Sequence, residues 1–79
     1  MSLEELEKKI TEAALFHRLA ASAIRVHPEG AFEYIRAARG ILVEVWTDME
    51  GSGEFPQTLV DRIMEIEHGL VVVITAHMP

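Results

Sequence analysis

Two apolar stripes on either side of one short turn constrain the fold of this chain more than any other feature. In each stripe the residues recur every three or four positions, the spacing that places side chains on one face of an α-helix. The turn between them, residues 51–56, is rich in glycine and proline and long enough only to reverse the chain. The pattern therefore predicts a hairpin of two helices. The stripes are Ala31, Ile35, Ala38, Leu42, Val45 and Met49, and Leu59, Ile63, Ile66, Leu70, Val73 and His77.

A further helix is predicted before the hairpin. Ser2 and Glu5 have the spacing of a capping box, which satisfies free N–H groups at the start of a helix. Proline disfavours helical geometry in the residue before it, so Pro28 interrupts the pattern. Residues 71–75 are β-branched and alone would predict a strand, but the helical period before them favours a helix. We therefore expect helices over residues 3–26, 31–50 and 56–77.

The expected fold is all-α: one domain, residues 1–79, of three antiparallel helices that run up, down and up. Self-association could complete it into a larger bundle. Gly51 is expected to end the second helix, because glycine tolerates the left-handed conformation found there. From residue 13 the first helix is apolar on two faces, and a helix of this kind lies between two layers. Leu15, Leu19 and Val26 make its second face.

The composition indicates more apolar surface than the interior can hold. A chain of 79 residues forms one domain with a small interior. It has no cysteine, so neither a disulfide nor a thiolate metal site can stabilise it. Yet 49% of its residues are hydrophobic. The surplus predicts a surface that is covered by self-association or by a partner.

The charge and the chain start limit the classes of partner and the location. A net charge of −6 argues against nucleic acid and anionic membrane surfaces, since both attract basic proteins. The longest apolar run, residues 70–74, is far shorter than the ~20 residues that span a bilayer. The first residues are acidic, unlike the basic start of a signal peptide. A cytoplasmic location is therefore expected, and no cofactor is implied.

The flanks of the last two helices form the candidate protein-binding surface. Tryptophan and arginine are enriched where proteins bind one another, and this surface combines the single tryptophan with two arginines. The alternative is that Trp46 completes the core against a neighbouring helix. A partner-binding role predicts that the flank is exposed in the isolated protein. The candidate residues are Phe32, Arg36, Arg39, Val43 and Trp46 on the second helix, and Val60, Met64 and Val71 on the third.

A metal-binding role is the first alternative. Glu65 and His68 have the Glu-x-x-His spacing of carboxylate metal sites in helical bundles, which would suit a small ferritin-like oligomer. On a helical wheel both point away from the apolar stripe, so the ligands could meet only across an interface between copies. A second alternative is a homo-oligomeric structural or adaptor protein, whose apolar face binds only itself.

Enzyme chemistry is not expected. The few serines and threonines lie in no nucleophile motif. The glycine turn is not followed by the lysine of a phosphate loop. We therefore expect a non-enzymatic protein.

One succession of segments extends from residue 34 to residue 78. Its parts are Tyr34-Ile35-Arg36-Ala37-Ala38, Ile41-Leu42-Val43-Glu44-Val45, Asp48-Met49-Glu50, the turn Gly51-Ser52-Gly53-Glu54, and an aliphatic helix from Leu59 onward. This succession resembles the flagellin export chaperones (the FliS family), in which a similar helix, a glycine-glycine-glutamate turn and another amphipathic helix follow one another. This chain is shorter than that family, and it has Ile66, Gly69 and His77 where the family has aromatic residues and asparagine.

The resemblance implies a cytoplasmic secretion chaperone. Such a chaperone binds the amphipathic end of an exported flagellar subunit and prevents it from polymerising early. Excess apolar surface on a small bundle suits the recognition of a helix in a groove. An acidic rim would also steer a basic partner toward it.

Overall fold

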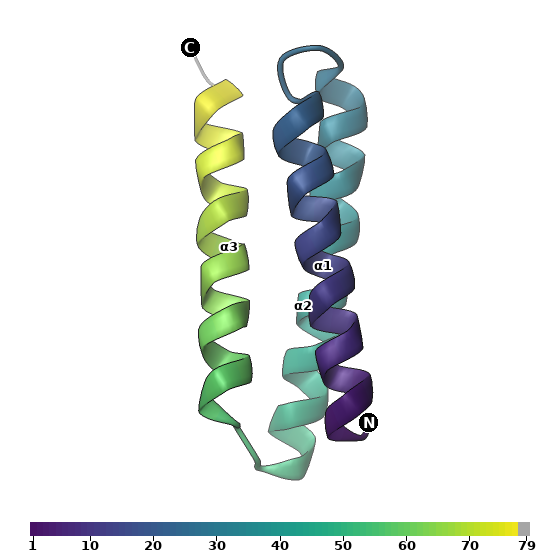
Figure 1. The fold of residues 1–79 in the computed structure, drawn as a ribbon, viewed down its shortest axis with the longest axis vertical. Helices are drawn as coiled ribbons and strands as arrows, with labels where there is room; N and C mark the ends of the chain where they lie inside the picture. The colour runs from purple at the N-terminus through teal and green to yellow at the C-terminus, as the bar shows by residue number, and fades with distance from the viewer. Residues whose placement is uncertain (78–79) are drawn as a thin grey trace.

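The computed structural model describes residues 1–77 as three helices joined by two short turns (Figure 1). Successive helices run in opposite directions, which confirms the predicted all-α, up-down-up bundle. The bundle is elongated, with extents of 40 × 17 × 16 Å. Met78, where the segment that resembles the flagellin export chaperones ends, lies outside the described residues. The helices are α1 (Leu3–Ala23), α2 (Pro28–Ser52) and α3 (Gln57–His77).

The first turn is shifted toward the start of the chain relative to the prediction. α1 ends at Ala23 rather than at residue 26, and α2 begins at Pro28 rather than at residue 31. Proline suits the first position of a helix, because its φ is preset and no N–H is needed there. The predicted cap of α1 is present: the Ser2 hydroxyl accepts a hydrogen bond from the Glu5 N–H at 3.2 Å.

The second turn shows which glycine ends α2. Gly51 lies inside the last turn of the helix, and Gly53 is the residue with a left-handed backbone, at φ 74° and ψ 8°. The Gly53 N–H donates to the Met49 carbonyl at 2.9 Å. The Ser52 hydroxyl donates to the same carbonyl at 3.1 Å and accepts from the Glu54 N–H at 3.2 Å. The expectation that Gly51 caps the helix is therefore wrong by two residues.

Alanine substitutions at the two glycines are expected to have opposite effects on stability. Gly53→Ala forces a side chain into the left-handed region and should lower the free energy of unfolding by about 1 kcal/mol. Gly51→Ala meets no atom within 4 Å and improves helix propensity, so stability should rise by up to about 1 kcal/mol. Urea unfolding followed by circular dichroism measures both changes. A loss of stability in Gly51→Ala without a loss in Gly53→Ala would mean that α2 ends at Gly51.

The core is formed by the predicted stripes. Each residue of the α2 stripe is buried, and so is each residue of the α3 stripe except His77, which is exposed at the end of the helix. Within residues 1–77 every buried side chain is apolar. The buried residues are Leu6, Ile10, Ala13, Ala20 and Ile24 from the α1 segment, the six of the α2 stripe, and Leu59, Ile63, Ile66, Leu70 and Val73.

α1 does not lie between two layers. Leu15 and Leu19 are exposed on α1, and Val26 is exposed in the turn that follows it. Only one face of α1 is buried, because no further helix within residues 1–77 covers the other. The second apolar face predicted from the sequence is therefore a solvent-exposed surface.

α1 holds the bundle together, because it packs on both other helices. Its contacts with α2 are the most extensive, and they are supported by an ion pair between Lys9 and Glu44 at 3.1 Å. Met1 also donates to Asp48 at 2.9 Å, and this hydrogen bond, with the attraction between the charges, raises the pKa of the amine above its ordinary value of 8.0.

α3 is joined to α1 at two points. The Arg62 guanidinium donates to the Thr11 hydroxyl at 3.1 Å. Further along, Gly69 leaves room for His17: a Cβ at residue 69 would lie 2.6 Å from the imidazole. α2 and α3 touch little, and no ion pair or side-chain hydrogen bond within residues 1–77 joins them. The bundle is therefore open along the line where α2 and α3 run side by side.

Candidate protein-binding groove

A continuous groove extends along the open line between α2 and α3. Three hollows, of about 370, 630 and 170 Å³, form it. Val43 lines the first two hollows, Arg39 and Ile74 line the second and third, and Glu67 lines the first and third. Because neighbouring hollows share lining residues, they make one surface, which we call the α2–α3 groove. It is lined by Phe32, Arg36, Arg39, Gly40, Val43, Trp46, Thr47 and Glu50 of α2, by Met64, Glu67, Val71 and Ile74 of α3, and by core residues at its floor.

The structure brings seven of the eight candidate binding residues together in this groove. Val60 is the exception: it is half-buried against the core and lines none of the hollows. The most exposed apolar residues of the groove are Val43, Met64 and Val71, at 64%, 59% and 58%. The core beneath them is already closed, so these side chains are not needed to complete it.

The aromatic residues of the groove lie near its two ends. Trp46 is half-buried and packs against Phe55 of the turn, with ring centroids 5.3 Å apart. Phe32 is 37% exposed, and its ring is nearly perpendicular to that of His77, with the ring centroids 5.3 Å apart. The sequence left open whether Trp46 belongs to the core or to a binding surface. In the structure it packs on the core and also lines the groove.

Charged residues of opposite sign occupy different parts of the groove. Arg36 lies in the first half of α2 and Arg39 near its middle, whereas Glu50 lies near the end of α2 and Glu67 at the middle of α3. Arg36 pairs with Glu33 on the exposed side of the same helix at 3.1 Å. Within residues 1–77, Arg39, Glu50 and Glu67 form no ion pair. The groove is therefore an apolar channel with a basic end at Arg36, an acidic end at Glu50, and the opposite charges of Arg39 and Glu67 between them.

Periodicity could have identified the groove residues that sequence reasoning missed. Glu50 continues the spacing of Phe32, Arg36, Arg39, Val43 and Trp46 by one more step of four residues. Glu67 lies between Met64 and Val71 at the same spacing, and Ile74 extends their stripe by one more step of three residues.

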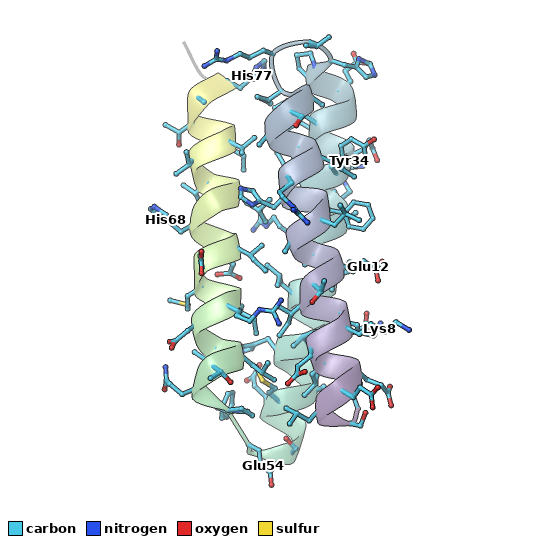
Figure 2. The ribbon with its side chains drawn as sticks, viewed as in Figure 1. Lys8, Glu12, Tyr34, Glu54, His68 and His77 are labelled. Carbon is cyan, nitrogen blue, oxygen red and sulfur yellow. The ribbon has the colours of Figure 1, made fainter. Side chains whose placement is uncertain are left out.

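The structure does not bring Glu65 and His68 into one site. Glu65 lines a shallow hollow between α1 and α3 with Arg18 and Arg62. His68 points away from the bundle on the outer side of α3 (Figure 2). Within residues 1–77, no three side chains of the histidine, aspartate and glutamate type converge on a point where a metal ion could sit. A metal site would therefore need ligands from another copy.

The chain was compared with models of protein families, with curated protein sequences and with solved structures, and none of them matches it. Within the helices described for residues 1–77, none combines the length and the apolar character that crossing a membrane requires. The fold and the groove define the class of protein on their own: a three-helix bundle with an open apolar groove between its last two helices.

Proposed function

We propose that this chain is a non-enzymatic protein-binding module whose α2–α3 groove holds an amphipathic helix of another protein. The observation that carries this proposal is the row of exposed apolar side chains above a core that is already closed. Exposing such a row to water is unfavourable, and it is retained where it serves binding.

A helix is the occupant that suits the shape of the groove. The antiparallel helices α2 and α3 form its walls. A ligand helix laid between them would be the fourth helix of the bundle, packed in the same way as the other three. Recognition of this type places apolar residues of the ligand, spaced by three and four, into a groove. Trp46 and the two arginines belong to the residue types that contribute most to binding energy.

The resemblance to the flagellin export chaperones suggests which helix this is. We propose that the chain acts in the cytoplasm as a flagellar secretion chaperone, and that it covers the amphipathic terminal helix of an exported subunit. The groove would shield the apolar face of that helix until export. The net charge of −6 would help to keep the complex soluble.

A titration with a synthetic peptide of the carboxyl-terminal helix of a flagellin tests this proposal. Trp46 is the single tryptophan of the chain and lines the groove, so its emission reports directly on the occupant. We expect a saturable shift of the emission to shorter wavelength, because the bound helix removes water from the indole. An unrelated, polar helical peptide of equal length is the control. Absence of binding would contradict the flagellar role, and binding without any change at Trp46 would contradict the groove.

A further inference from the structure

The α2–α3 groove is complementary to itself in charge. Arg36 and Glu50 are each seven residues from Val43, so they lie at equal distances on either side of it along α2. At a rise of 1.5 Å per residue, about 21 Å separate the two levels. A rotation of 180° about an axis through the level of Val43, perpendicular to α2, exchanges the basic end of the groove with the acidic end.

Two symmetric arrangements would lay one groove on another, and the charges distinguish them. If the two-fold axis runs along the helices, Arg36 and Arg39 of both copies meet at the same end, and like charges repel. If the axis lies across the helices, Arg36 of each copy faces Glu50 of the other. Glu67 lies near that axis, so the two Glu67 carboxylates approach each other. Arg39 lines the same hollow in each copy and forms no ion pair within residues 1–77, so it can offset their charge.

We propose that the occupant of the groove in the absence of a partner helix is a second copy of this chain, docked antiparallel about a two-fold axis at Val43. Each copy then covers the exposed Val43, Met64 and Val71 of the other. The interface is isologous, with an apolar centre and a charged pair repeated at its two ends. The dimer itself does not depend on the proposed function, but both use the same groove. A partner helix must therefore displace the second copy, so self-association competes with partner binding.

Charge reversal and charge exchange test this dimer by sedimentation equilibrium. We expect wild type to form a dimer, and we expect R36E and E50R alone to weaken it at least 10-fold, because each places like charges face to face twice. The double variant R36E/E50R should recover the dimer, since the exchanged charges face each other again. A mixture of the R36E and E50R chains should form a one-to-one heterodimer. The control exchange K8E/E12R lies on the outer side of α1 and should leave the association unchanged (Figure 2).

The outcomes separate this inference from the proposed function. A wild-type chain that is monomeric at all concentrations, or that forms a larger oligomer, overturns the dimer. So does a dimer that the single reversals do not weaken. If the monomeric chain still binds the flagellin peptide at Trp46, the proposed function stands without the dimer. If the dimer forms as described but the peptide does not bind even at concentrations at which wild type dissociates into monomers, the dimer stands and the flagellar role fails.

Discussion

Replacing Leu42 by alanine is expected to lower the free energy of unfolding by about 2–5 kcal/mol. Leu42 is 1% exposed and lies in the middle of α2, within the core to which all three helices contribute. Alanine removes the apolar contacts of the leucine and leaves a cavity that the surrounding residues fill only in part. A domain of this size has a total stability of about 4–12 kcal/mol. The loss would therefore be a large fraction of the total.

The matched control for this prediction is the same substitution at Leu15. Leu15 also lies in a helix, but it is 47% exposed on the outer side of α1. Leu15→Ala should change the stability by less than about 0.5 kcal/mol. Urea unfolding at one fixed protein concentration, followed by circular dichroism, measures both variants. Similar losses at the two positions would mean that Leu42 is not in the core.

Replacing Val43 by glutamate is expected to weaken binding of the flagellin helix at least ~30-fold, the size of a hot-spot effect of about 2 kcal/mol. Val43 is shared by the two largest hollows of the groove and is 64% exposed in the free chain. A bound helix would cover it, and covering a carboxylate is strongly unfavourable because the charge loses its hydration. The fold should be intact, because residue 43 does not belong to the core.

Leu15→Glu is the control for the groove variant. It introduces the same charge at another exposed apolar position of a helix, outside the groove. Peptide titrations followed through Trp46 should give wild-type affinity for this variant. Equal weakening by both variants would show that the effect is one of overall charge and not of the groove.

The main features of the fold could be predicted from the sequence because they depend on local patterns. Spacing by three and four identifies the buried faces of α2 and α3, and glycine and proline locate the turns. The same spacing favours a helix at residues 71–75 over the strand that their β-branched side chains suggest, and α3 indeed continues to His77.

The remaining features depend on how the helices are placed relative to one another. Periodicity shows that Leu15 and Leu19 form an apolar face, but it cannot show that this face is left uncovered. It also cannot show that α1 packs on both neighbours while α2 and α3 stay apart, and that separation creates the groove. The choice between Gly51 and Gly53 as the end of α2 depends on the hydrogen bonds that the Gly53 N–H and the Ser52 hydroxyl donate to the Met49 carbonyl, which periodicity does not reveal.

Site-specific photo-crosslinking in the native host tests the central claim, that the α2–α3 groove is the binding surface, most directly. A benzophenone amino acid replaces Val43 or Met64 in the groove, and Leu15 or Val72 outside it, four exposed apolar positions on helices. We predict adducts from positions 43 and 64 only, mapped by mass spectrometry to an amphipathic helix, either of a second copy or of an exported subunit. No adduct from the groove positions, or the same adducts from positions 15 and 72, would contradict the claim.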